Sequence, residues 1–131
     1  MTALYTDLDP YCCRVLRARV ADGGLPHGDV LECPIEELGD AQLRGRDQIH
    51  LFAGIGGFPL GFKWAGLPDD FSVVTGGFPC QDLSIAGKGA GLGGSRSGLW
   101  WQMLRIVRLA GPRWVVVENV AALLGRGLGS V

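Results

Sequence analysis

Three short apolar runs, at residues 49–52, 71–75 and 114–117, constrain the fold more than any other feature of this chain. Each run reads as a buried strand, and helical segments separate them. Such strands assemble into parallel sheets, which carry their chemistry where the strands end. The residues that directly follow the three runs are therefore the first candidates for a functional site.

The fold class that this pattern predicts is α/β, a three-layer sandwich with about five mostly parallel strands. We expect strands at 2–6, 29–32, 48–52, 71–75 and 114–117, and helices at 58–65 and about 97–110. The 131 residues suit one domain, 1–131, and 47% hydrophobic with 19% charged residues is typical of a globular chain.

The setting that the sequence predicts is cytoplasmic. No signal peptide opens the chain, and no apolar stretch approaches the roughly 20 residues that a membrane span needs. The four cysteines match neither a secreted disulfide framework nor a metal spacing, so we expect no metal. Cys12, Cys13 and Cys33 are interpreted as reduced packing residues.

A thiol and an acid follow two of the predicted strands. Cys80 comes after strand 71–75 and directly after Pro79, and Glu118 comes after strand 114–117. Alone, Cys80 would read as an inert buried thiol and Glu118 as an exposed acid. Because parallel strands end at one edge, the two side chains are expected to face each other as nucleophile and acid.

Three motifs around these residues resemble the catalytic motifs of DNA cytosine-5 methyltransferases. They are Gly76-Gly77-Phe78-Pro79-Cys80-Gln81, the loop from Ser84 to Trp100, and Glu118-Asn119-Val120. The resemblance implies a Rossmann-like sheet, S-adenosylmethionine as methyl donor, and a cytosine flipped out of double-stranded DNA as acceptor. It implies that Cys80 adds to C6 of the base, with Glu118 donating to N3 and Asn119 beside it.

The donor site is expected at the glycine turn after strand 48–52. A glycine cluster alone indicates only a tight turn, but Ala53-Gly54-Ile55-Gly56-Gly57-Phe58 resembles the family's first cofactor motif. Segment 4–11 resembles the second motif, and Gly28-Asp29-Val30 the third, with Asp29 accepting from the adenine amino group. The residues that the resemblance assigns to the donor are Phe52, Gly54, Ile55, Gly56, Gly57, Asp7, Leu8, Asp29, Val30 and Pro79.

The order of these motifs is permuted, because the second and third precede the first. Asp7 stands where the family usually has Glu, and Asp9 before Pro10 also reads as a helix cap. If strand 48–52 connects through helix 58–65 to strand 71–75, a right-handed crossover fixes the sheet face of that helix. Either the helix has changed face relative to the family, or the crossover is unusual.

DNA contacts are expected from the carboxyl-terminal part of the chain. Residues 48–131 hold 7 basic and 4 acidic groups, whereas residues 1–47 hold 5 basic and 9 acidic groups. By resemblance the DNA-binding residues are Gln81, Ser84, Lys88 and Arg96, and the glycine-rich loop 87–94 is either a lid or a disordered linker. Arg105 and Arg108 are expected on the solvated face of helix 97–110.

The family's later Gln-x-Arg-x-Arg motif and a target-recognition domain have no counterpart in this sequence. Three explanations compete: a truncated enzyme, a split enzyme completed by a second chain, and a donor-binding domain that has lost catalysis. We expect the first for the chain as given. The competing functional hypothesis is a catalytically inactive module that binds S-adenosylmethionine and DNA.

Overall fold

The structure, a computed structural model, describes residues 2–78 and 98–119. Each predicted strand overlaps an observed strand whose bounds lie within two residues of the prediction. The described strands are β1 (Thr2–Asp7), β2 (Gly28–Glu32), β3 (Arg46–Leu51), β4 (Val73–Gly76) and β5 (Trp114–Val117). The helices are α1 (Pro10–Ala21), the 3-10 turn η1 (Ile35–Glu37), α2 (Asp40–Leu43), α3 (Gly57–Trp64) and α4 (Gly98–Ala110).

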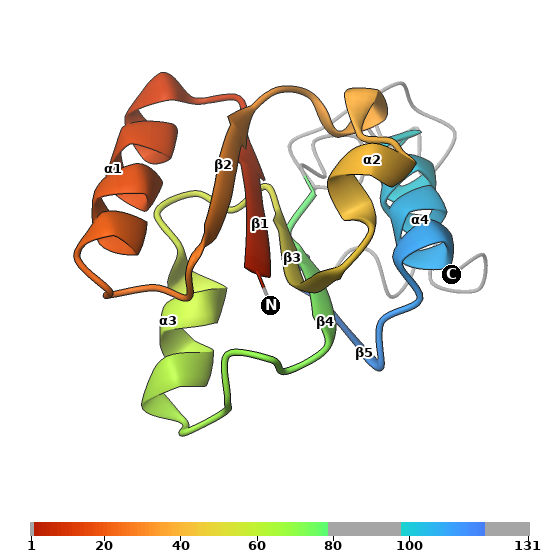
Figure 1. Ribbon diagram of the computed structural model, residues 1–131. Helices are drawn as coiled ribbons and strands as arrows, with labels where there is room; N and C mark the ends of the chain where they lie inside the picture. The colour runs from red at the N-terminus through yellow and green to blue at the C-terminus, as the bar shows by residue number, and fades with distance from the viewer. Residues whose placement is uncertain (1, 79–97, 120–131) are drawn as a thin grey trace.

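The five described strands form one sheet in the order β2-β1-β3-β4-β5, and every pairing is parallel. Helices cover both faces of this sheet, so the predicted three-layer α/β architecture is confirmed (Figure 1). The strand ends of β1, β2 and β3 therefore share one edge, where the glycine turn after β3 also lies. No helix in the described ranges is long and apolar enough to cross a membrane.

Alternating side chains of the strands build a separate apolar core on each face. On one face Leu4, Ile49 and Val74 pack against η1, α2 and α4, with Met103 and Ile106 fully buried. On the other face the core contains side chains of β1, α1, α3 and the turn after β3; these are Ala3, Tyr5, Leu16, Val20, Ala53 and Leu60. Helices α1 and α3 thus share one face, and α4 lies on the opposite one.

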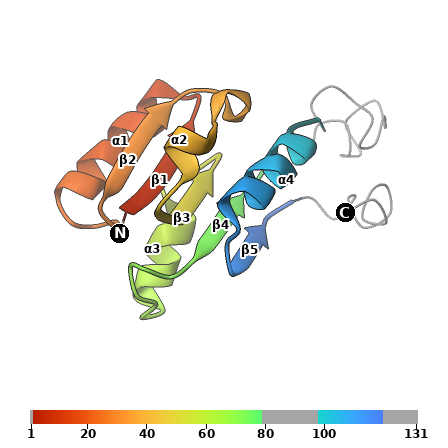
Figure 2. The same cartoon turned by 45° about the vertical axis from the view of Figure 1, so that its right-hand side comes forward.

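The connection from β3 through α3 to β4 is a left-handed crossover. The step from β1 to β2 and the step from β3 to β4 run in opposite directions along the sheet, yet α1 and α3 cover the same face. The two crossovers must therefore have opposite hands. Figure 2, in which α2 and α4 lie in front of upward-running strands, identifies β1-α1-β2 as the usual right-handed unit. Only about 2% of such connections are left-handed, so the crossover is the unusual feature.

Aromatic packing holds α3 on this face. Phe62 of α3 contacts both the His50 ring of β3 and the Phe71 ring that precedes β4, with centroid separations of 6.3 and 5.7 Å. The Lys63 ammonium donates to the Gly23 carbonyl in the turn after α1. These contacts join α3 to both neighbouring strands and to the α1 layer, which accounts for its position despite the rare hand.

His50 lies at the centre of a buried polar network beneath α3. Its Nδ1 is 2.8 Å from Thr75 Oγ1 and its Nε2 is 3.0 Å from Gln48 Oε1, while the ring stacks on Tyr5. Both ring nitrogens thus have partners without any carboxylate. Burial lowers the pKa of His50 to about 3, so the imidazole is neutral in the folded protein.

The buried histidine should make folding stability depend on pH. Unfolded His50 takes up a proton below its ordinary pKa near 6.5, whereas the folded protein does not until about pH 3. Stability is therefore fully present above pH 6.5 and falls as the pH drops, by about 2 kcal/mol between pH 7 and pH 5. Urea unfolding of wild type and His50→Gln at pH 7 and at pH 5 measures the effect. The fall in the free energy of unfolding between these two pH values should be smaller in His50→Gln, by about 2 kcal/mol. His27→Gln, at an exposed histidine, is the control, and an unchanged pH dependence in His50→Gln would contradict the assignment.

Candidate active site

A hollow of about 310 Å³ opens at the carboxyl ends of β1, β2 and β3, where open parallel sheets bind ligands. The first turn of α4 closes one side of it. The lining is mostly apolar and comes from the three strand ends, the segment before α2 and that first turn: Thr6, Asp7, Leu8, Cys33, Pro34, Ile35, Glu36, Phe52 and Leu99. A hollow of this size and character suits a small organic ligand with few polar contacts.

The turn after β3 has the backbone that its glycines predict. Phe52, Gly54 and Gly56 have φ values of 51°, 55° and 90°, in the left-handed region. At Gly56 a Cβ atom would come within 2.7 Å of a Leu25 methyl group, so both backbone conformation and packing require glycine. Phe52 is the only non-glycine residue with positive φ among the described residues, a strained conformation that places its side chain in the hollow.

Asp7 joins the end of β1 to this turn. Its Oδ2 accepts from the Gly54 N–H at 2.8 Å and its Oδ1 accepts from the Asp9 N–H at 2.9 Å. Asp9 in turn accepts from the Tyr11 N–H at 2.8 Å and caps α1, which begins at Pro10, so the predicted cap is confirmed. The shorter Asp side chain thus binds the glycine turn directly and also lines the hollow.

Sequence reasoning missed several lining residues. Thr6 Oγ1 is fully buried at the hollow and has no hydrogen-bond partner in the described part of the chain. The segment 33–36 follows β2 and lines the hollow, where burial raises the pKa of the Cys33 thiol and keeps it neutral. The available signal was that Thr6 ends a predicted strand and segment 33–36 follows one, because residues at and beyond the ends of parallel strands lie at the binding edge.

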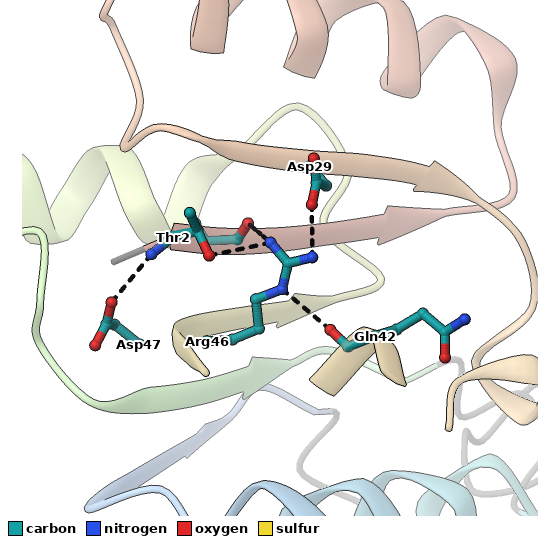
Figure 3. Close-up of polar contacts among 6 residues, drawn as sticks. Thr2, Asp29, Gln42, Arg46 and Asp47 are labelled. Carbon is teal, nitrogen blue, oxygen red and sulfur yellow. Dashed lines mark hydrogen bonds and ion pairs between the residues drawn. The ribbon is translucent and has the colours of Figure 1, made fainter. Parts of the chain in front are cut away.

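Asp29 and Val30, both assigned to the donor by resemblance, do not lie at this edge. Asp29 pairs with Leu4 near the start of β2, and its carboxylate accepts from Arg46 at 2.5 Å (Figure 3). The Arg46 guanidinium also donates to Thr2 Oγ1 and to the Gln42 carbonyl, which ties β1, β2 and β3 together at their amino-terminal ends. Asp29 is therefore part of a structural contact at the opposite edge of the sheet.

Of the turn after β3, Phe52 alone is among the described residues that line the hollow. Ile55 is 62% exposed, and Gly57 begins α3, so neither residue lines the hollow in this structure. Phe52, Asp7 and Leu8 do line it. The structure thus brings together the strand-end residues of the predicted set rather than the glycines themselves.

Glu118 and Asn119 lie at the same edge, beside the end of β4. The Glu118 N–H donates to the Gly76 carbonyl, and a Cβ atom on Gly77 would lie 2.7 Å from Glu118 Oε2. Asn119 Nδ2 donates to the Phe78 carbonyl at 3.4 Å. The chain therefore leaves the described part at Phe78 next to the acid, one residue before Pro79. Pro79, Cys80, Gln81, Ser84, Lys88 and Arg96 lie outside the described residues.

Comparison with known proteins is consistent with this architecture. The family model for C-5 cytosine-specific DNA methylases matches residues 63–130, so the chain belongs to this family, whose members use S-adenosylmethionine as methyl donor. The chain is 30% identical over 128 residues to the type II methyltransferase M.AquIA of Picosynechococcus sp., covering 98% of this chain and 43% of the relative. With M.HhaI of Haemophilus parahaemolyticus it shares 33% over 119 residues, covering 64% of this chain and 36% of the relative. The chain thus spans less than half the length of these relatives.

Proposed function

We propose that this chain binds S-adenosylmethionine and supplies the catalytic residues that transfer its methyl group to C5 of a cytosine in DNA. One observation carries the proposal: the hollow at the ends of β1–β3 and the carboxyl group of Glu118 after β5 lie on one edge of one sheet. Phe78 lies at that same edge, and Pro79 and Cys80 are the next two residues in the sequence.

The described residues fit a nucleoside-containing donor. Phe52 offers an aromatic face, the Asp7 carboxylate retains free lone pairs for ribose hydroxyls, and Thr6 Oγ1 is a buried hydroxyl that lacks a partner among the described residues. In this proposal the residues around the adenine are those of segment 33–36, because Asp29 lies at the other edge of the sheet. When bound, the donor supplies an electrophilic methyl group on sulfur.

The chemistry that we assign to the chain is addition and elimination at the base. The Cys80 thiolate adds to C6 while Glu118 donates to N3, so the π electron pair of the C5–C6 double bond becomes available at C5. C5 then takes the methyl group, with the sulfur of the donor leaving as a neutral thioether. Loss of the C5 proton to a base and expulsion of the thiolate restore the aromatic ring and free Cys80.

Double-stranded DNA is the proposed substrate, contacted by Gln81, Ser84, Lys88 and Arg96, and a second polypeptide is the proposed partner. The partner is supported by β5, which is the last strand on its side among the described strands and whose Trp114, Val115 and Val117 are all exposed. Parallel strands with apolar side chains on both faces are normally covered on both. A polypeptide equivalent to the part of the relatives outside the match would cover β5.

Calorimetry with S-adenosylmethionine, followed by transfer of tritiated methyl groups to DNA, tests this function. We expect donor binding that Phe52→Ala weakens about tenfold and that Tyr11→Ala, at an exposed aromatic outside the hollow, leaves unchanged. We expect transfer when a polypeptide carrying the part of M.HhaI outside the matched stretch is added. Transfer by the chain alone would remove the need for the partner. Donor binding without transfer under either condition would favour the catalytically inactive module, and absent donor binding would overturn the proposal.

A further inference from the structure

Arg105 of α4 has an unusual set of partners for a helix-surface arginine. Its Nη1 donates to the Leu38 carbonyl at 2.8 Å, and its Nη2 donates to the carbonyls of Ile35 and Glu36 at 3.0 and 3.5 Å. Its Nε donates to Gln102 Oε1 on the preceding turn of α4 at 2.9 Å. The side chain is half-buried, so the expected solvated position is wrong for Arg105, whereas Arg108 is exposed as predicted.

The three carbonyls belong to η1 and its carboxyl-terminal cap, the turn that directly follows β2. Ile35 and Glu36 line the hollow on one side, and Leu99, at the start of the helix that carries Arg105, lines it on another. Arg105 therefore joins two walls of the same hollow. Beneath this bridge Ile35 and Leu38 are buried in the core formed with Met103 and Ile106.

The guanidinium charge is balanced by backbone dipoles. None of the ion pairs among the described residues includes Arg105, and the carbonyls at the end of η1 form the negative end of that short turn. A planar guanidinium can donate to several carbonyls at once, whereas a lysine ammonium reaches fewer of them in a fixed geometry. The contact is thus specific to arginine, and Nε, Nη1 and Nη2 each donate within the protein.

We propose that Arg105 is a positioning residue that sets the shape of the donor pocket by holding residues 35–38 against α4. This inference rests on the proposed function, because it takes the hollow to be the S-adenosylmethionine site. Loss of the guanidinium leaves the wall held to α4 only by the apolar packing of Ile35 and Leu38, so more of the pocket must be ordered each time the donor binds.

Calorimetry with S-adenosylmethionine on three variants tests the role. Arg105→Met should raise the Kd about tenfold, the equivalent of one lost charge-assisted hydrogen bond, and Arg105→Lys should recover part of that loss. Arg108→Gln is the matched control, since it removes an exposed arginine one turn further along α4 and should bind as wild type. Melting temperatures measured alongside distinguish weaker binding from partial unfolding.

Amide hydrogen exchange gives a readout that does not depend on the donor. The Glu37 and Leu38 N–H groups donate to the carbonyls of Pro34 and Ile35, and both should exchange faster in Arg105→Met. Unchanged exchange, or wild-type affinity in Arg105→Met, would overturn the positioning role. If Arg105→Met does not fold, Arg105→Lys replaces it in the test. Donor affinity of Arg105→Lys equal to that of wild type would then overturn the positioning role. Wild-type protein that fails to bind the donor, with faster exchange in the variant, would instead overturn the proposed function alone.

Discussion

Replacing Cys80 by alanine should reduce methyl transfer by roughly 10⁴-fold or more while leaving donor binding unchanged. Cytosine C5 is too electron-poor to take a methyl group until a nucleophile has added at C6, and alanine provides none. Among the described residues, those that line the donor hollow come from the ends of β1, β2 and β3, the segment before α2 and the first turn of α4, and all of them are intact in Cys80→Ala, so affinity for S-adenosylmethionine should persist. Incorporation of tritiated methyl groups into DNA, in the presence of the second polypeptide, measures the loss.

A matched thiol substitution and a trapping experiment make this result specific. Cys12→Ala removes a thiol of α1 outside the hollow and should retain full transfer. DNA carrying 5-fluorocytosine should become covalently attached to wild-type protein, because fluorine at C5 cannot leave as the proton does. Mass spectrometry should locate the adduct at Cys80 and find none in Cys80→Ala. Transfer that survives the substitution would remove Cys80 as the nucleophile.

The sheet was predictable because each strand is encoded locally. Runs such as Trp114–Val117 and Val73–Gly76 are apolar and rich in β-branched residues, and their ends determine the active edge. The rule that ligands bind where parallel strands end also excludes Asp29 from the donor site. It was predicted at the first position of its own strand, and the first position of a parallel strand lies at the edge opposite the site. The resemblance of Gly28-Asp29-Val30 to a family motif outweighed this geometric argument.

Tertiary packing decided what local patterns could not. The hand of the β3-α3-β4 crossover depends on which face the Phe62 side chain covers, and Phe62 contacts His50 and Phe71 across two strands. Similarly, Arg105 occupies a helical position that hydrophobic periodicity places toward solvent. Its carbonyl partners lie about 70 residues earlier in the chain, so no local pattern identifies them.

Replacing Glu118 by glutamine should lower methyl transfer by about 10²–10⁴-fold with little change in donor affinity. The amide has nearly the same shape and still donates a hydrogen bond, but it cannot give a proton to N3 as C6 is attacked. The backbone contact that positions residue 118, from its N–H to the Gly76 carbonyl, is unaffected by the substitution. Single-turnover transfer rates for wild type and Glu118→Gln measure the effect, and 5-fluorocytosine adducts should form correspondingly more slowly.

Gly77→Ala tests whether the position of this carboxyl group matters as much as its identity. A Cβ atom on Gly77 would lie 2.7 Å from Glu118 Oε2, a separation that side chains do not tolerate, so the carboxylate must rotate away. Since the end of a flexible side chain can move cheaply, the fold should persist while the transfer rate falls about tenfold, from displacement of the acid. Gly61→Ala in α3 is the matched control, because nothing lies within 4 Å of its added Cβ atom. Equal transfer rates for Gly77→Ala, Glu118→Gln and wild type would show that the acid acting on N3 lies elsewhere in the protein.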